Sequence, residues 1–176
     1  VMVKVCGIGE SMAETMIQDL IDNQSNPTIA PYAKTGEVHF RITAKAKTKE
    51  ECETIIQPVI LELKKRFENN IYSLKDEENL EDVVVNLLIQ KNLTVSTAES
   101  CTGGLLAKKI TDVSGSSKIF DMGIVSYANR IKNEFLEVPN DVLETVGAVS
   151  EETARQMAVG VTKLAKIPTS TKEEQQ

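Results

Sequence analysis

Residues 95–104 constrain the fold of this chain most, because they join a strand pattern to a helix pattern through a turn of hydroxyl residues and glycines. β-Branched residues precede the turn, Gly103 and Gly104 close it, and apolar residues follow at helical spacing through Ile110. A serine at such a junction lies beside unpaired N–H groups and the positive end of a helix dipole. Ser100 therefore marks a place for either an anion or a nucleophile beside an oxyanion hole.

An alternation of helix and strand patterns surrounds this turn. The expected elements are helices over 80–91 and from 105 to about 113, strands over 93–97 and 118–126, two short helices, and a last helix capped by Ser150. This order predicts an α/β layered (α/β/α) domain over residues 76–166, with a partly parallel sheet. Only two strands are clear, so we expect an incomplete domain. Residues 167–176 have no apolar period and are predicted to be a disordered tail.

Residues 1–75 form a separate pattern of strand, helix, hairpin, helix and strand. The polar run over residues 75–79 is the predicted boundary between the two domains. Capping-box spacing predicts helices that begin after Ser11, with Glu14, and after Thr48, with Glu51. The fold class that we expect is a small α+β domain followed by the α/β layered domain.

The second hairpin strand, over residues 37–47, alternates apolar and polar side chains. The polar face carries a basic stripe made of His39, Arg41, Lys45 and Lys47. Nucleic acid could contact such a stripe, but it is more commonly the solvated face of a half-buried sheet. We expect the solvated face.

The charge and the cysteines limit the classes of function. The net charge of −6 comes from residues 76–176, which hold ten basic and sixteen acidic residues, so this half is a poor candidate for binding nucleic acid. No apolar run approaches the roughly 18 residues of a membrane span, and the start has no basic, cleavable signal. Three cysteines without pair or metal spacing indicate a reducing compartment. We expect a cytoplasmic protein.

Ser100 needs a base to act as a nucleophile. The single histidine, His39, lies in the first predicted domain, so we do not expect a Ser-His-Asp triad. Tyr127 and Lys132 follow the second strand of the α/β domain, and the carboxyl ends of parallel strands share one crevice. A desolvated lysine loses its proton near neutrality and can accept one from serine. Three alternatives remain open: the hydroxyl residue before the helix is a plain N-cap, the turn binds an anion without chemistry, or Cys101 is the nucleophile.

Three motifs in this order carry a family resemblance: Ala-Glu-Ser-Cys-Thr-Gly-Gly over residues 98–104, Ser-Tyr-Ala-Asn-Arg-Ile-Lys over 126–132, and Gly-Ala-Val-Ser over 147–150. They resemble the C-terminal domain of the CinA (competence/damage-inducible) family, which is the nicotinamide-nucleotide amidase. Residues 1–74 resemble the KH-like middle domain of that family. Family members continue after the last helix with further strands, so the resemblance implies that residues 76–166 are a partial amidase domain.

The resemblance implies that Ser100 is the nucleophile and that Tyr127 and Lys132 serve in acid–base roles. The substrate-binding residues that it implies are Thr102, Gly103, Gly104 and Asn129. The reaction is hydrolysis of nicotinamide mononucleotide to nicotinate mononucleotide and ammonia, without a metal or cofactor. We expect no nucleic-acid or membrane partner, and we expect a homo-oligomer because an unfinished sheet exposes an edge. The alternative is a non-catalytic module for nucleotide or nucleic-acid binding or for oligomerisation.

Overall fold

The computed structural model describes residues 1–166, and the described chain forms two compact units that divide between Val83 and Val84. The division falls inside helix α4 (Leu80–Lys91). The domain boundary expected at residues 75 and 76 stays a prediction. The predicted tail over residues 167–176 lies outside the described residues.

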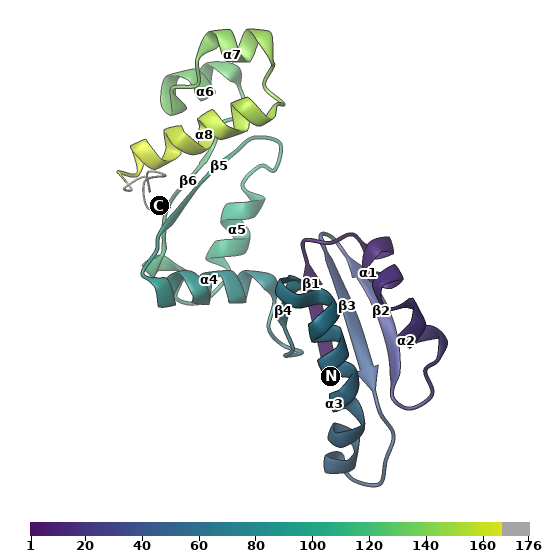
Figure 1. The fold of residues 1–176 in the computed structure, drawn as a ribbon. Coiled ribbons are helices and arrows are strands. Elements are labelled where there is room, and N and C mark those ends of the chain that lie inside the picture. Colours follow the sequence, from purple (N-terminus) through teal and green to yellow (C-terminus); the bar gives the residue numbers. More distant parts are fainter. Residues whose placement is uncertain (167–176) are drawn as a thin grey trace, which may run out of the picture. The chain divides into compact units, whose positions relative to one another are not determined.

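The first unit is a four-stranded antiparallel sheet with helices (Figure 1). Its elements are β1 (Met2–Cys6), α1 (Glu10–Met16), α2 (Gln18–Asp22), β2 (Thr28–Lys34), β3 (Glu37–Thr43), α3 (Lys49–Phe67), a 3₁₀ turn (Glu68–Asn70) and β4 (Ile71–Ser73). The strands lie in the order β2-β3-β1-β4. The predicted succession of strand, helix, hairpin, helix and strand is confirmed.

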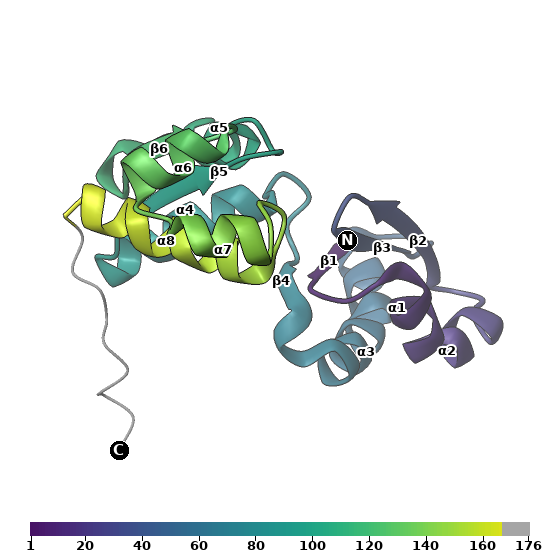
Figure 2. The same cartoon turned by 90° about the horizontal axis from the view of Figure 1, so that it is seen from above.

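The three helices of this unit lie on one face of the sheet (Figure 2). Helix α3 begins as predicted, because the Thr48 side chain accepts a hydrogen bond from the Glu51 N–H at 3.2 Å. Its apolar stripe is buried against the sheet, where Phe67 stacks on Phe40 with ring centroids 5.3 Å apart. The alternation of β3 places Val38, Phe40 and Ile42 in the same core.

The first helix differs from the expectation. It begins at Glu10 after Gly9, which makes no side-chain cap, so the capping box predicted from Ser11 is wrong. The chain leaves helical geometry at Ile17, with φ −127°, and resumes as α2. Ile17 is fully buried there. The structure thus has two short helices where sequence periodicity joins the residues into a single helix.

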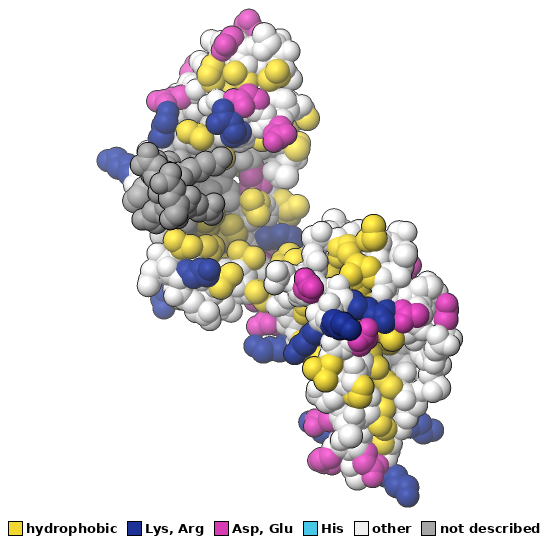
Figure 3. Space-filling view, in the orientation of Figure 1, with side chains coloured by type: hydrophobic (Ala, Val, Ile, Leu, Met, Phe, Trp, Pro, Cys, Tyr) yellow, Lys and Arg dark blue, Asp and Glu magenta, His cyan; other side chains and the backbone are white. Residues whose placement is uncertain are grey.

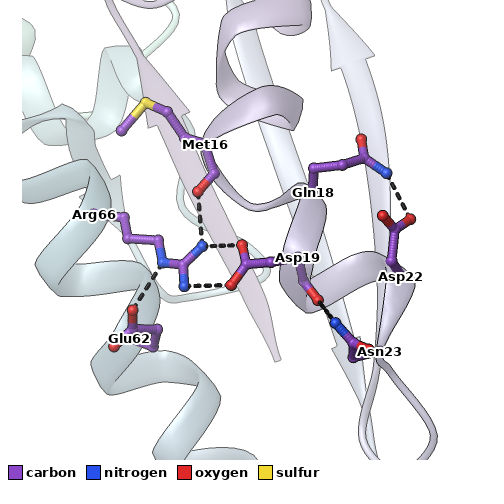
Figure 4. A network of polar contacts seen from close by, with 7 residues as sticks. All are labelled: Met16, Gln18, Asp19, Asp22, Asn23, Glu62 and Arg66. Atoms are coloured by element: carbon purple, nitrogen blue, oxygen red, sulfur yellow. Dashed lines mark hydrogen bonds and ion pairs between the residues drawn. The ribbon is translucent and has the colours of Figure 1, made fainter.

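Arg66 of α3 connects the helices of the first unit (Figure 4). Its guanidinium donates a bidentate pair of hydrogen bonds to the Asp19 carboxylate, one to the Met16 carbonyl at 2.8 Å, and one to Glu62 at 2.8 Å. This fork geometry suits arginine and not lysine. Arg66 thereby fixes the α1–α2 segment against α3.

The predicted basic stripe is not a continuous solvated face. His39 is only 3% exposed, and its Nε2 lies 2.9 Å from Glu37 Oε2 and 3.0 Å from the Tyr72 hydroxyl. β3 ends at Thr43, so Lys45 and Lys47 lie outside the strand. The expectation of a solvated His39 is wrong because the partly buried Glu37 carboxylate and Tyr72 hydroxyl supply the polar partners that water would otherwise give.

The second unit is an α/β layer arrangement around a parallel pair of strands. From α4 onward its elements are β5 (Val95–Glu99), α5 (Leu105–Thr111), a 3₁₀ turn (Ser116–Lys118), β6 (Phe120–Val125), α6 (Asn129–Leu136), α7 (Asn140–Thr145) and α8 (Glu151–Leu164). The predicted parallel pairing and the predicted helices are confirmed. β5 starts two residues later than expected and continues to Glu99, directly before Ser100.

Helices cover both faces of this strand pair (Figure 1). On one side Val85 of α4 and Ile110 of α5 are buried with Ile119, and on the other Leu136 of α6 and Met157 of α8 are buried. α8 approaches the end of α6 at Gly160, where a Cβ atom would lie 2.1 Å from the Leu136 carbonyl oxygen. Gly160 is therefore required for the contact of these two helices.

Apolar side chains also remain at the surface of this unit, over α4 and α5 (Figure 3). Leu87, Leu105 and Leu106 are each about half exposed. Among the residues that the structure describes, no helix has the length and apolarity needed to cross a membrane.

Candidate functional site

Ser100 follows the last residue of β5 and begins a tight turn. The Gly103 N–H donates to the Ser100 carbonyl at 3.1 Å, and Gly103 and Gly104 have φ values of 62° and 96°. Side-chain-bearing residues rarely adopt these left-handed values, which accounts for the two glycines. The turn ends at the start of α5, with Ser100 on the strand side of it.

Lys132 of α6 meets Ser100 at the carboxyl ends of the two strands. Its side chain is fully buried, and its Nζ lies 3.1 Å from Ser100 Oγ. The same nitrogen donates to the carbonyl oxygens of Ser126 at 2.7 Å and Tyr127 at 2.9 Å. The structure thus brings together two residues that are 32 positions apart in the sequence.

The two carbonyl partners define what Lys132 can do in each protonation state. A neutral amine has two N–H donors, which the carbonyls of Ser126 and Tyr127 occupy, so its lone pair is left for the Ser100 hydroxyl. An ammonium ion has a third N–H, which donates to Ser100 Oγ instead. Burial lowers the pKa of Lys132 below its ordinary value of 10.5, while the charge of Cys101 acts in the opposite direction. The geometry suits a general base for Ser100.

Glu99 was part of the sequence motif, but its role was not predicted. It is 4% exposed, and its carboxylate accepts hydrogen bonds from three N–H groups at the start of α5: those of Gly104 at 3.1 Å, Leu106 at 3.0 Å and Ala107 at 2.8 Å. Burial pushes its pKa upward, but these hydrogen bonds and one from Thr102 outweigh burial and hold the pKa below its ordinary value. The sequence signal was an acidic residue at the end of a strand, followed by a short turn into a helix.

The anion cradle expected at the Gly103–Gly104 helix start is therefore filled from within the chain. The Gly103 N–H donates to Ser100, and the Gly104 N–H donates to Glu99. In the part of the chain that the structure describes, no hydrogen bond engages the N–H groups of Cys101 and Thr102. The substrate-binding role of the 102–104 turn stays a prediction, and these two groups are its available donors.

Tyr127 and Asn129 lie differently from Lys132. The Tyr127 side chain is 77% exposed, and the residue contacts Lys132 through its backbone carbonyl. Asn129 is the first residue of α6 and is exposed. Neither of them lines the cavity beside Ser100. Their acid–base and substrate-binding roles stay predictions.

A cavity of about 550 Å³ opens beside Ser100 within the second unit. It lies between the Ser100 turn and the start of α8, and its wall is mainly apolar. Its lining includes Ala98, Ser100, Cys101, Thr102, Ala148, Val149, Ser150 and Met157. Ser150 caps α8 as predicted, since its side chain accepts the Thr153 N–H. The sequence motif over residues 147–150 thus forms the wall that faces the serine turn.

No part of the described chain, residues 1–166, gathers three or more His, Cys, Asp or Glu side chains in a way that could hold a metal ion. His39 belongs to the first unit, where it pairs with Glu37. The groups near Ser100 that can take part in a reaction are therefore a lysine and backbone N–H groups, and a cavity lies beside them.

Comparison with known proteins gives matches over both units. The family model of the CinA C-terminal domain matches residues 77–170, and that of the damage-inducible protein CinA KH domain matches residues 2–73. A CinA-like protein from Dictyoglomus turgidum is 51% identical over 162 residues, which is 92% of this chain and 39% of that protein. One from Kosmotoga olearia is 50% identical over 164 residues, which is 93% of this chain and 40% of the relative.

The chain thus spans about 40% of the length of these curated relatives. Among solved structures, a competence-damaged protein (CinA) superfamily protein from Escherichia coli matches with a TM-score of 0.50 and 36% sequence identity. That match covers 53% of this chain and 56% of the Escherichia coli chain.

Proposed function

The chain belongs to the CinA family, and we propose that Ser100 and Lys132 of its α/β unit hydrolyse the carboxamide of nicotinamide mononucleotide to nicotinate mononucleotide and ammonia. One observation carries the proposal: the buried Lys132 Nζ lies 3.1 Å from Ser100 Oγ, with its other hydrogen bonds directed to two carbonyls. The cavity beside Ser100 has room for the ring and sugar of a nucleotide.

In the first step Ser100 Oγ attacks the carboxamide carbon while neutral Lys132 takes the hydroxyl proton. The carbonyl electron pair moves onto its oxygen and gives a tetrahedral intermediate. When the intermediate collapses, the C–N bond breaks, and the Lys132 ammonium returns its proton to the leaving nitrogen, which departs as ammonia. The product of this step is an acyl ester on Ser100.

A water molecule then attacks the ester, and Lys132 again accepts a proton. The C–O bond to Ser100 breaks, Ser100 receives that proton from Lys132, and the carboxylic acid leaves and loses its own proton to the solvent. Water and amide are consumed in equal amounts, and acid and ammonia are formed. Lys132 therefore acts as base and acid in each half of the reaction.

The negative oxygen of the intermediate needs N–H donors close to Ser100. The N–H groups of Cys101 and Thr102 supply them, because the N–H groups of Gly103 and Gly104 are already bonded within the chain. In serine hydrolases with a strand–turn–helix site, the residue after the nucleophile commonly provides one such donor. Removing one oxyanion donor typically costs about 10²–10³ in kcat.

The remaining predicted residues act at the rim of the site in this proposal. The hydroxyl of Tyr127 assists proton transfer after its exposed ring turns toward bound substrate, and the Asn129 amide contacts the polar part of the nucleotide. The reaction takes place in the cytoplasm, in keeping with three cysteines that form no disulfide in the structure.

We also propose that the chain self-associates. The half-exposed leucines over α5 and α4 and the edges of a two-strand sheet support this proposal. Sedimentation equilibrium tests it. A single monomeric species at all concentrations up to about 100 μM would contradict it.

Ammonia release from nicotinamide mononucleotide by the purified chain tests the catalytic proposal. We expect release by the unchanged chain and by Lys118→Met, whose lysine is exposed. We expect loss of at least about 10²-fold in Ser100→Ala and in Lys132→Met, which remove the nucleophile and the base.

The same experiment separates the rival hypothesis of a non-catalytic binding module. Calorimetric binding of the nucleotide without ammonia release would favour the rival. Equal ammonia release by Ser100→Ala and the unchanged chain would refute Ser100 as the nucleophile.

A further inference from the structure

Glu99 is a buried charged group for which the proposed reaction has no use. Among the described residues its carboxylate makes no hydrogen bond to Ser100 Oγ or Lys132 Nζ, although Glu99 lines the same cavity as Ser100; it accepts hydrogen bonds from three N–H groups at the start of α5, those of Gly104, Leu106 and Ala107. These N–H groups have no partner within the helix itself. The carboxylate therefore ties the end of β5 to the start of α5, and Ser100 lies in the turn between them.

The backbone of Glu99 is tied to the other half of the site. Its carbonyl accepts the Ser126 N–H at 2.8 Å, and the Ser126 carbonyl in turn accepts Lys132 Nζ at 2.7 Å. One residue thus holds both the turn that carries the nucleophile and the strand end that orients the base. A displacement of the turn or of the strand end would separate Ser100 Oγ from Lys132 Nζ.

We propose that Glu99 is a positioning residue for the reaction of Ser100: its carboxylate holds the 100–104 turn so that Ser100 Oγ stays within hydrogen-bond distance of Lys132 Nζ. The inference rests on the function proposed for this pair.

Glutamine cannot take over this role. Its amide oxygen can accept a hydrogen bond, but its NH₂ group only donates. The NH₂ group would therefore face another donor, either the N–H of Ala107 or the N–H groups of Gly104 and Leu106. The charged form is also the form that suits the site, because hydrogen bonds to N–H groups hold the Glu99 pKa below its ordinary value. Glu99→Gln is therefore a nearly isosteric variant that weakens the tie without opening a large cavity.

The probe for the test is phenylmethanesulfonyl fluoride, which labels an activated serine. Ser100 Oγ forms the bond to sulfur, the S–F bond breaks, fluoride leaves, and Lys132 takes the hydroxyl proton. The rate of Ser100 labelling is measured by mass spectrometry from pH 6 to pH 11, at a temperature where circular dichroism shows each variant to be folded. Glu144→Gln, an exposed glutamate on α7, is the matched control.

We expect the plateau rate of Glu99→Gln to fall about tenfold, with the pH of the inflection unchanged because the burial of Lys132 is unaffected. A merely structural role would lower the melting temperature without changing the plateau rate of the folded protein. A plateau rate for folded Glu99→Gln within twofold of the unchanged chain would overturn the proposal. The control variant is expected to keep the full rate.

Chemical rescue gives a second test. In Glu99→Ala, added acetate can enter the vacated place at the start of α5, so we expect it to raise the labelling rate severalfold over chloride at equal ionic strength. An equal rate in acetate and chloride, in folded Glu99→Ala, counts against the carboxylate as the positioning group.

A spectroscopic readout keeps this inference apart from the proposed function. The Lys132 ¹³Cε chemical shift reports its contact with Ser100 whether or not the serine reacts. We expect Glu99→Gln to move this shift to the value found in Ser100→Ala. If the unchanged chain is not labelled, the nucleophile proposal fails. The shift alone then decides on Glu99, and an unmoved shift contradicts its positioning role.

Discussion

Lys132 Nζ lies 3.1 Å from Ser100 Oγ, and the lysine side chain is fully buried while Ser100 lines the cavity. Two backbone carbonyls hold the nitrogen in place. Burial disfavours the charged form, and the carbonyls satisfy the neutral form. The pair is therefore arranged for transfer of a proton from serine to lysine.

The protonation of Lys132 should govern the pH dependence of the reaction. Burial lowers its pKa in the folded chain from 10.5, so the base form appears at lower pH than for an exposed lysine. We expect ammonia release to rise with pH and to level off above the Lys132 pKa. NMR titration of the Lys132 ¹³Cε resonance measures this pKa directly.

The lowered pKa of Lys132 also predicts how the stability of the folded chain changes with pH. The unfolded chain binds the Lys132 proton more tightly than the folded chain, so stability rises with pH between the lowered pKa and about 10.5. Lys132→Met should remove this slope, whereas Lys118→Met should keep it. A Lys132 resonance that titrates at or above 10.5 would contradict both expectations.

Gly160→Ala should destabilise the α/β unit strongly. The new methyl group would lie 2.1 Å from the Leu136 carbonyl oxygen, so α8 and α6 must separate. We expect a loss of about 3 kcal/mol in the free energy of unfolding, at the upper end of overpacking costs. Urea unfolding followed by NMR signals of this unit measures it.

Gly9→Ala is the control for this change, because no atom lies within 4 Å of its added Cβ and its φ is −72°. We expect it to alter the stability of the first unit by less than about 1 kcal/mol. Equal, small effects of the two substitutions would show that α8 and α6 do not need the close approach at Gly160.

Arg66→Lys should loosen the first unit although it keeps the charge. Lysine cannot reproduce the bidentate hydrogen bonds to Asp19 together with those to Glu62 and Met16 (Figure 4). Because Asp19 is 60% exposed, solvent screening limits the loss of stability, which should still exceed the loss caused by a substitution of an exposed α3 residue outside the network. Urea unfolding of the chain, followed by NMR signals of the first unit, gives the value.

The control for Arg66 is Lys65→Met, which changes the neighbouring exposed residue of α3. It should shift the stability by no more than about 0.5 kcal/mol. A similar, small loss in both variants would mean that the guanidinium network contributes little.

Much of the fold follows from local pattern. The order of strands and helices, the parallel pairing of β5 with β6 and the cap of α3 at Thr48 were predicted, and the family resemblance drawn from three motifs is confirmed. Strand alternation and capping act over a few residues, so a sequence displays them directly.

Features that depend on tertiary contacts were missed. The break between α1 and α2 falls at Ile17, a fully buried core residue, and buried His39 bonds to Glu37 and to Tyr72, which is 33 residues away. Sequence periodicity assigns such residues to one face of a helix or strand. It does not show which residue of another element they contact.

The proximity of Ser100 and Lys132 was predicted from the sequence, but the hydrogen bonds of the Glu99 carboxylate were not. Ser100 and Lys132 could be placed at one edge because both follow parallel strands. The fold-back of the Glu99 carboxylate onto α5 depends on the length and backbone angles of the Gly103–Gly104 turn. The two glycines indicate positive φ angles, but they do not show that the turn brings the Glu99 carboxylate onto α5.

Activation of Ser100 as the nucleophile by Lys132 is tested most directly by the position of the adduct formed with phenylmethanesulfonyl fluoride. Peptide mapping should find the label on Ser100 in the unchanged chain and in Lys118→Met, with at least about a 10²-fold lower rate in Lys132→Met. A label on Cys101, or a Ser100 label that forms as fast in Lys132→Met, would contradict the account.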